Sequence, residues 1–247
     1  MAERDGRPGS AVVLDERELT GRARTHVVDV EAPRCTLHPQ TVEAFLALRE
    51  AAAGAGIDLA PVSSFRDFDR QLTIWNAKFR GERPLYDAAG DMLDFGRLGP
   101  GELIDTILLW SALPGASRHH WGSDLDVIDR AALPPGCEAR LLPQEFAPGG
   151  PFSALDAWLR GNMAHFGFFR PYQCFRGGVC PEPWHLSFAP VAEPALRALT
   201  VERLAAALEG SGLAGLESVL ARLPELHARY VCAIDRPGSL SASTRLS

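Results

Sequence analysis

Two short segments combine histidines with carboxylates in patterns that suit metal chemistry. The first, residues 117–128, reads SRHHWGSDLDVI, and the second, residues 181–188, reads PEPWHLSF. Imidazole nitrogens and carboxylate oxygens are the usual ligands of zinc in catalytic sites. Whether such groups meet depends on the local structure of each segment.

The first segment is expected to form a sharp turn followed by a strand. Gly122 permits the turn after the histidines. Side chains alternate along a strand, so Asp124 and Asp126 share one face while Leu125 and Val127 share the other. The apolar face fixes the register of the strand. The opposite face then presents its carboxylates at a fixed position.

The second segment is also expected to form a strand with one apolar face and one polar face. Trp184, Leu186 and Phe188 share an apolar face, and His185 points the other way. Glu182 lies just before this strand, close enough in sequence to reach the same cavity.

Two such strands side by side would bring His119, Asp126 and His185 around one point. Two imidazoles and one carboxylate leave a fourth position open, which is typical of catalytic rather than structural zinc. Glu182 is then a surplus carboxylate that can take a proton from water. A histidine followed by an aspartate seven residues later is common by itself, whereas the Glu-Pro-Trp-His run is rarer but could be an ordinary hairpin. Burying so many ionisable groups is costly, however, unless they are paired or bound to a metal.

The motifs also carry a family resemblance. The pattern Ser-x-His-x-x-Gly-x-x-x-Asp, followed by Glu-x-Trp-His, resembles the zinc D-alanyl-D-alanine carboxypeptidases and dipeptidases of the VanY and VanX kind. These belong to the lysostaphin, D-Ala-D-Ala-peptidase and hedgehog fold group. The upstream sequence SSFR at residues 63–66, and WLRGNMAHFGF at residues 158–168, are similar to further elements of that family. The resemblance covers roughly residues 38–189.

The resemblance implies a role for each matching residue. It implies that zinc is held by His119, Asp126 and His185, that Glu182 and Arg66 are catalytic, and that Ser117 and Gln71 contribute to substrate binding. Arg66 would stabilise the oxyanion or hold a substrate carboxylate.

Asp124 departs from the family, which usually has a small residue such as alanine there. The extra carboxylate is a candidate to bind a substrate amine or a cation, or to hydrogen-bond the turn. Asp124 is therefore among the expected substrate-binding residues.

Composition excludes several other function classes. The chain has 247 residues and a formal net charge of −6, which argues against nucleic-acid binding. No apolar run reaches the roughly 20 residues that span a bilayer.

The first 25 residues lack the apolar region of a secretory signal. That favours a cytoplasmic protein, or a periplasmic one whose leader has been removed. Five cysteines without CxxC pairs predict neither a disulfide framework nor a four-cysteine zinc site.

Hydrophobic periodicity predicts the elements that must position the site. Helices are expected at residues 39–53, 68–79 (after the cap Asp67), 102–113, 152–166 and 190–234. Strands are expected at 57–64 and from 123, with a hairpin at 172–188 that turns at Gly177-Gly178. Surface loops are expected at residues 81–100 and 130–150. The fold class is α+β, a small antiparallel sheet carrying the zinc site and flanked by helices.

We predict a flexible lead-in at residues 1–25, a zinc peptidase domain at 26–190, a helical extension packed on it at 191–236 and a disordered tail at 237–247. The expected activity is a zinc D,D-carboxypeptidase acting on peptidoglycan stem peptides, as a monomer or homodimer. The alternatives are an L,D-carboxypeptidase, an endopeptidase or a D-Ala-D-Ala dipeptidase of the same fold. A non-catalytic zinc-binding interaction module is a further alternative.

Overall fold

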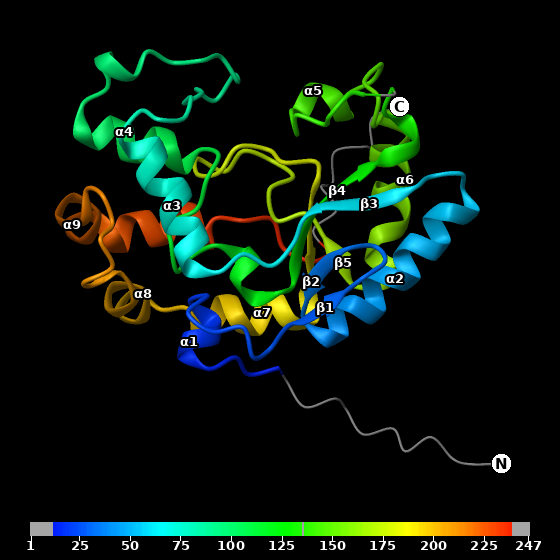
Figure 1. Ribbon diagram of the computed structural model, residues 1–247, viewed down its shortest axis with the longest axis horizontal. Coiled ribbons are helices and arrows are strands. Elements are labelled where there is room, and N and C mark those ends of the chain that lie inside the picture. The colour runs from blue at the N-terminus through cyan, green and yellow to red at the C-terminus, as the bar shows by residue number, and fades with distance from the viewer. Residues whose placement is uncertain (1–11, 135, 239–247) are drawn as a thin grey trace, which may run out of the picture.

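A four-stranded antiparallel sheet runs through the centre of the protein (Figure 1). The computed structural model describes residues 12–134 and 136–238. The strand order is β3-β4-β6-β5, and a separate antiparallel pair is formed by β1 and β2. The strands are β1 (Val28–Val30), β2 (Cys35–Leu37), β3 (Leu59–Ser63), β4 (Asp124–Asp129), β5 (Phe168–Phe169) and β6 (His185–Phe188). Small antiparallel sheets among helices confirm the predicted α+β class.

One face of the central sheet is covered by two helices, α2 (Pro39–Gly54) and α6 (Ser153–Asn162) (Figure 1). Leu125, Val127 and Leu186 are buried in the same apolar cluster as residues of these helices. This is the apolar face that alternation along the two strands predicted. The polar residues of β4 and β6 therefore face the other way.

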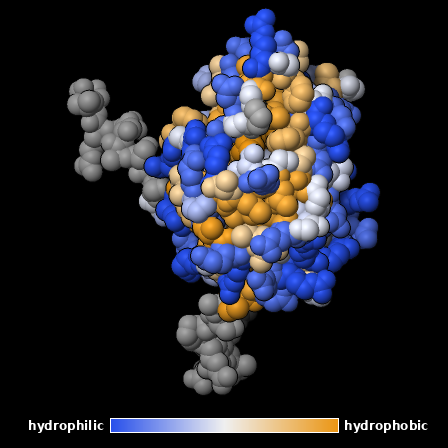
Figure 2. All heavy atoms as spheres, turned by 90° about the vertical axis from the view of Figure 1, so that its left-hand side faces the viewer, coloured by the Kyte–Doolittle hydropathy of each residue, from blue (hydrophilic) through white to orange (hydrophobic). Residues whose placement is uncertain are grey.

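A second group of helices packs beyond that polar face. It comprises α3 (Phe68–Phe79), α4 (Pro100–Leu108), α7 (Ala189–Ala198), α8 (Val201–Leu208) and α9 (Leu216–Leu226), which ends in a π-helical turn, His227–Cys232. These helices share one buried apolar cluster. Figure 2 views the side of the molecule where α3, α4, α8 and α9 lie, with hydrophobic residues running between hydrophilic margins.

The C-terminal helices are joined to the rest of the domain by hydrogen bonds as well as by apolar contacts. Trp75 Nε1 donates to the carbonyl oxygen of Ala214 at 3.0 Å, and Asn76 binds the backbone at Gly212 and Ala214. The predicted helical content of residues 190–234 is confirmed. The domain limits drawn from the sequence stay a prediction. None of the helices among the described residues is long and apolar enough to cross a membrane.

Two expectations about local structure were wrong. Residues 12–25, assigned to the flexible lead-in, contain helix α1 (Glu16–Leu19) with a capping box between Asp15 and Glu18. Leu19 is buried, and its carbonyl oxygen accepts a hydrogen bond from Trp121 Nε1 at 3.0 Å. Residues 1–11, and 239–247 of the predicted tail, lie outside the described residues.

The second wrong expectation is the hairpin at residues 172–188. Only β6 is a strand there, and it pairs with β5 rather than with residues across a turn at Gly177-Gly178. Tertiary contacts satisfy the backbone of the intervening loop instead. Asp235 accepts hydrogen bonds from the backbone N–H groups of Gln173 and Cys174 at 3.0 and 2.9 Å. The turn signal was present, but these contacts override it.

The predicted helix at residues 102–113 also differs, because α4 begins at Pro100 and ends at Leu108. The helix predicted at residues 152–166 likewise divides into α6 and a 3-10 turn at Met163–Phe166. Helix α5 (Pro143–Phe146) and the 3-10 turns at Phe95–Arg97 and Arg130–Ala132 lie in the predicted loops, and a further 3-10 turn at Arg118–Trp121 precedes β4. The predicted turn at Gly122 is present, with φ of 66°.

We expect Gly122→Ala to lower the free energy of unfolding by about 1–3 kcal/mol, since L residues are strained at positive φ. An added Cβ would also lie 2.5 Å from Val27 Cγ1 and 2.7 Å from the backbone nitrogen of His38. Urea denaturation measures the loss. The control is Gly161→Ala in α6, where an added Cβ meets nothing within 4 Å and helix propensity improves. Equal stability of the two variants would contradict this interpretation of the turn.

Candidate active site

The pairing of β4 with β6 sets the geometry of the site. Asp126 is the Cα partner of His185, and Asp124 is the partner of Ser187. Directly paired residues of antiparallel strands project to the same side of the sheet. These two residue pairs therefore bring the two sequence motifs together, as expected.

His119 comes from the 3-10 turn that precedes Gly122. Its Nδ1–H donates to the carbonyl oxygen of Ser64 at 2.9 Å, which leaves Nε2 facing Asp126 Oδ2 at 3.5 Å. On the other side of the same carboxylate, His185 Nδ1 lies 3.2 Å from Asp126 Oδ1. The two imidazole rings flank Asp126, with their centroids 5.0 Å apart.

These three side chains form a donor set that fits a divalent metal ion. One ligand atom from each lies within 4.8 Å of the others, and all three residues are buried. Tetrahedral bonds of about 2.0–2.1 Å would place ligand atoms about 3.3 Å apart, close to the spacings seen here. Asp126 Oδ1 is buried, and its contact with His185 Nδ1 at 3.2 Å does not have the geometry of a hydrogen bond. A metal ion bound between these two atoms would satisfy the oxygen better than the contact does.

Charge in the cluster favours a bound cation. Burial lowers the pKa of His119 to about 4, although Asp126 opposes the shift, so its imidazole is neutral and its lone pair is available. Burial also opposes protonation of His185, but its contacts with the carboxylates of Asp124, Asp126 and Glu182 outweigh burial and raise its pKa well above the ordinary value. The cluster thus already attracts positive charge, which a divalent ion supplies.

Glu182 lies next to these residues, with Oε2 3.4 Å from His185 Nδ1. Burial raises the pKa of its carboxyl group and outweighs the opposing effect of His185. A carboxylate with a raised pKa is a stronger base than a solvated one, as a group that accepts and returns a proton requires. The predicted position of Glu182 beside the cluster is therefore matched by its chemistry.

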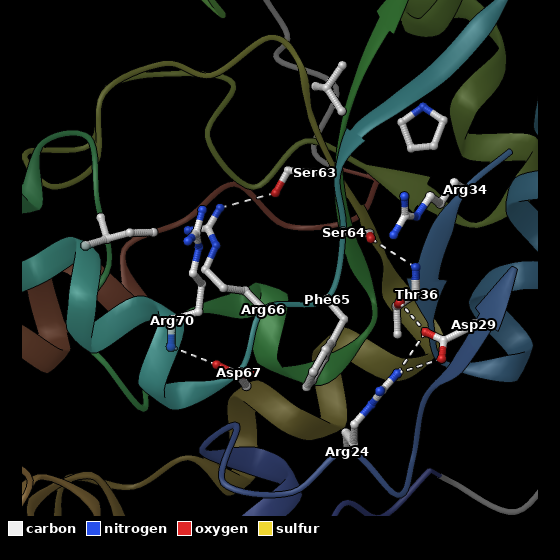
Figure 3. Close-up of a pocket in the computed structure, with 13 residues that line it drawn as sticks. Arg24, Asp29, Arg34, Thr36, Ser63, Ser64, Phe65, Arg66, Asp67 and Arg70 are labelled. Atoms are coloured by element: carbon white, nitrogen blue, oxygen red, sulfur yellow. Dashed lines mark hydrogen bonds and ion pairs between the residues drawn. The ribbon is translucent and has the colours of Figure 1, made fainter. Parts of the chain in front are cut away.

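Arg66 is held rigidly at the edge of the site. Its guanidinium donates to Gln71 Oε1 at 2.8 Å and to Ser63 Oγ at 3.2 Å, and its carbonyl oxygen accepts from His120 Nδ1 at 2.5 Å. Arg66 also borders a neighbouring pocket of about 530 Å³, where Figure 3 draws its hydrogen bond to Ser63. Coulombic attraction from Asp126 and Glu182 acts on the same guanidinium.

Of the roles expected for Asp124, a hydrogen bond to the turn is the one that its contacts match. Its side chain is fully buried and accepts hydrogen bonds from His185 Nε2 at 2.9 Å and Arg118 Nε at 2.8 Å, and also from the hydroxyl of Ser123. Burial opposes its ionisation, but Arg118 and His185 outweigh burial and hold its pKa below the usual range. Asp124 thus fixes the ring of His185 from behind, with Nδ1 directed at the cluster.

Gln71 and Ser117, the other two residues expected to bind substrate, lie in different positions relative to the pocket. Gln71 is fully buried, and its amide links Arg66 to the carbonyl oxygen of Ala112 at 2.7 Å, so it positions Arg66. Ser117 does line the pocket over the cluster, as expected. That pocket has a volume of about 970 Å³ and also contains His119, Asp126, Glu182 and His185 in its wall.

Sequence reasoning missed two side chains of the site. Arg118 donates to Ser187 Oγ at 2.6 Å as well as to Asp124, and so ties β4 to β6 beneath the cluster. Tyr172 lies edge-on to His185, with the ring centroids 5.1 Å apart. The unusual carboxylate at position 124 was the available signal for Arg118, since a buried Asp needs a cation. No pattern in the sequence pointed to Tyr172.

We expect Arg118→Met to lower the free energy of unfolding by about 3–5 kcal/mol, because Asp124 would remain buried without its cation. The matched control is Arg24→Met, which removes an arginine whose pair with Asp29 is 60% and 63% exposed; its cost is expected to be below about 1 kcal/mol. Chemical denaturation of both variants checks the difference. A loss for Arg118→Met as small as that of the control would contradict a buried ion pair.

The site can now be compared with known proteins. An uncharacterized protein of Haemophilus influenzae is 47% identical over 103 residues, covering 40% of this chain and 70% of the relative. Two solved structures are similar: VanYB in complex with D-alanine-D-alanine (20% identity, TM-score 0.48, 69% of this chain and 80% of that one) and the L,D-carboxypeptidase LdcB (19% identity, TM-score 0.46, 78% and 69%). The family model for VanY, D-alanyl-D-alanine carboxypeptidase, matches residues 34–191. The chain belongs to the VanY D-alanyl-D-alanine carboxypeptidase family.

Proposed function

We propose that this protein is a zinc-dependent D,D-carboxypeptidase that removes the C-terminal D-alanine from peptidoglycan stem peptides or related D-amino-acid peptides. The observation that carries the proposal is the convergence of His119, Asp126 and His185, with Glu182 beside them, on one pocket. Membership of the VanY family supports the class of substrate.

The ligand atoms for zinc would be His119 Nε2, His185 Nδ1 and an oxygen of Asp126. When bound, the ion supplies a Lewis acid for the scissile carbonyl and lowers the pKa of water towards about 7. Each histidine donates its other ring N–H to a fixed acceptor, Ser64 or Asp124. Such contacts orient the ligand and increase its basicity.

Glu182 takes the role of general base and then general acid. Its carboxylate accepts a proton from the water that attacks the amide carbon, and it returns that proton to the leaving amine as the C–N bond breaks. The raised pKa of Glu182 suits both steps. Burial brings the pKa of its carboxyl group closer to the pKa values of the water and the amine with which it exchanges the proton.

Arg66 stabilises the negative charge that develops on the scissile carbonyl oxygen. Its contacts with Ser63 and Gln71 restrict the guanidinium before substrate arrives. A donor fixed in advance needs little reorganisation during the reaction, which is why such groups favour the transition state over the ground state. Ser117 contributes to the pocket wall.

The main competing function is a zinc module that binds a partner without catalysis. Neither Glu182 nor Arg66 is needed for a structural site, and a buried carboxylate with a raised pKa beside the donor set favours an enzyme. Incubation with N-acetyl-L-Lys-D-Ala-D-Ala, with and without a chelator, separates the two functions. Release of D-alanine that stops with the chelator and returns with zinc is expected. Stoichiometric zinc with no cleavage of any D-alanine or mixed-chirality peptide would favour the binding module.

We expect Glu182→Gln to retain zinc and to lower kcat by at least about 10²–10⁴-fold, because the amide preserves the shape of the side chain but cannot accept the proton. Steady-state kinetics and metal analysis of the same preparation measure the two properties. The companion variant Asp126→Asn is expected to lose zinc along with activity. Loss of zinc from Glu182→Gln would instead make Glu182 a metal ligand and overturn its assigned role.

A further inference from the structure

A lysine without a partner lies in the wall of the catalytic pocket. Lys78 lines that pocket together with Arg66 and Arg83. Within the described part of the chain, its ammonium group makes no hydrogen bond and has no carboxylate within the 4.0 Å of an ion pair. Arg66, another basic side chain of the pocket wall, is by contrast already engaged by Ser63 and Gln71.

The environment of Lys78 makes an unpaired ammonium unfavourable. Burial, together with repulsion from Arg83 and Arg66, lowers its pKa to about 8, and Glu182 opposes the shift. At neutral pH the group still carries its charge. A partly desolvated cation that the protein leaves unpaired is a group whose counter-charge arrives with a ligand.

Helix α3 places Lys78 close to the reacting groups. Gln71 and Lys78 are seven residues apart, so they lie two turns apart on one face of the helix. Gln71 holds Arg66, and Lys78 interacts electrostatically with both Arg66 and Glu182. The ammonium therefore belongs to the same polar wall as the proposed oxyanion donor and the proposed general base.

A carboxypeptidase substrate brings a negative charge to this region. Its free carboxylate lies one residue beyond the scissile bond, and consecutive Cα atoms are only about 3.8 Å apart. The leaving residue must therefore place its carboxylate near the group that returns the proton, which is Glu182. Repulsion between these two carboxylates has to be offset by a cation beside them.

We propose that Lys78, with Arg83 beside it, binds the free C-terminal carboxylate of the peptide substrate and so makes the enzyme specific for chain ends. The inference rests on the proposed function and deepens it, because it assigns a specificity-determining residue. Arg66 then serves the scissile carbonyl and Lys78 serves the terminus. A lysine suits the second role, since its flexible stem lets a compact charge follow the carboxylate of the leaving residue.

The test compares two peptides on two variants. N-acetyl-L-Lys-D-Ala-D-Ala and its C-terminal carboxamide are hydrolysed by the zinc-containing wild type, Lys78→Met and Lys78→Arg at pH 7. For the free acid, Lys78→Met is expected to raise KM about 10–100-fold, as loss of a hydrogen bond to a charged group predicts, with kcat changed less than threefold. The wild type should cleave the carboxamide poorly, Lys78→Met should cleave it as the wild type does, and Lys78→Arg should recover most of the preference for the acid.

The matched control is Arg80→Met. Arg80 follows directly after α3 and carries the same charge, but its side chain is 58% exposed, pairs with Glu82 and does not line the pocket. Its kinetics should match those of the wild type. An equal loss of kcat by Lys78→Met on both peptides would overturn the proposal, because Lys78 would then only tune Glu182. Equal cleavage of acid and carboxamide by the wild type would also overturn it and indicate an endopeptidase.

Measurements of peptide binding test the role of Lys78 independently of the proposed reaction. Calorimetry with zinc-loaded Glu182→Gln, and with the same protein carrying Lys78→Met, measures affinity for each peptide without turnover. If the Glu182→Gln protein binds the acid more tightly than the carboxamide, and Lys78→Met removes this difference, the carboxylate site is supported. This holds even if the wild type cleaves neither peptide, because only the proposed reaction would then be wrong. Equal affinity for the two peptides in the Glu182→Gln protein would contradict the role of Lys78.

Discussion

The antiparallel pairing of β4 with β6 is the constraint on which the rest of the site depends. It places Asp126 opposite His185 and Asp124 opposite Ser187, so that two distant parts of the chain present polar groups on one face. The register is fixed from the other face, where Leu125, Val127 and Leu186 are buried. A shift of one residue would turn the carboxylates into the apolar cluster and expose the leucines to the site.

Placing so many ionisable groups on a buried face requires that each has a partner. Arg118 and Ser123 satisfy Asp124, Asp124 in turn fixes His185, and the backbone at Ser64 fixes His119. Asp126 Oδ1 is left without a hydrogen bond at the point where two imidazole nitrogens also meet. Behind the cluster, protein groups thus satisfy Asp124 and one ring nitrogen of each histidine, whereas the atoms at the front are arranged for a cation. This division agrees with a site that binds metal rather than one that merely buries charge.

The sequence predicted the chemistry of the site better than its surroundings. Alternation along residues 123–128 and 184–188 gave the correct faces, and Asp67 was correctly identified as the cap of α3. These features are local, since they depend on the period of a strand or on one turn of a helix. Gln71 and Asp124 were found in the sequence but given contacts with substrate, whereas the structure buries both as positioning groups.

The expectations that failed depend on contacts between distant parts of the chain. The hairpin at Gly177-Gly178 is absent because Asp235 and other C-terminal groups take up the backbone of that loop. Helix α1 is ordered against Trp121, about a hundred positions away in sequence. Arg118 and Tyr172 were overlooked for the same reason, since the role of each depends on residues from another element. Periodicity and turn chemistry carry no information about such partners.

The most direct measurement of the central claim is anomalous diffraction at the zinc edge from crystals of the zinc-loaded protein. One strong peak is expected, bonded at about 2.0–2.2 Å to His119 Nε2, His185 Nδ1 and a carboxylate oxygen of Asp126. Glu182 should lie nearby without bonding to the ion. A peak located elsewhere in the molecule, or the ring of His185 turned away from Asp126, would contradict the account.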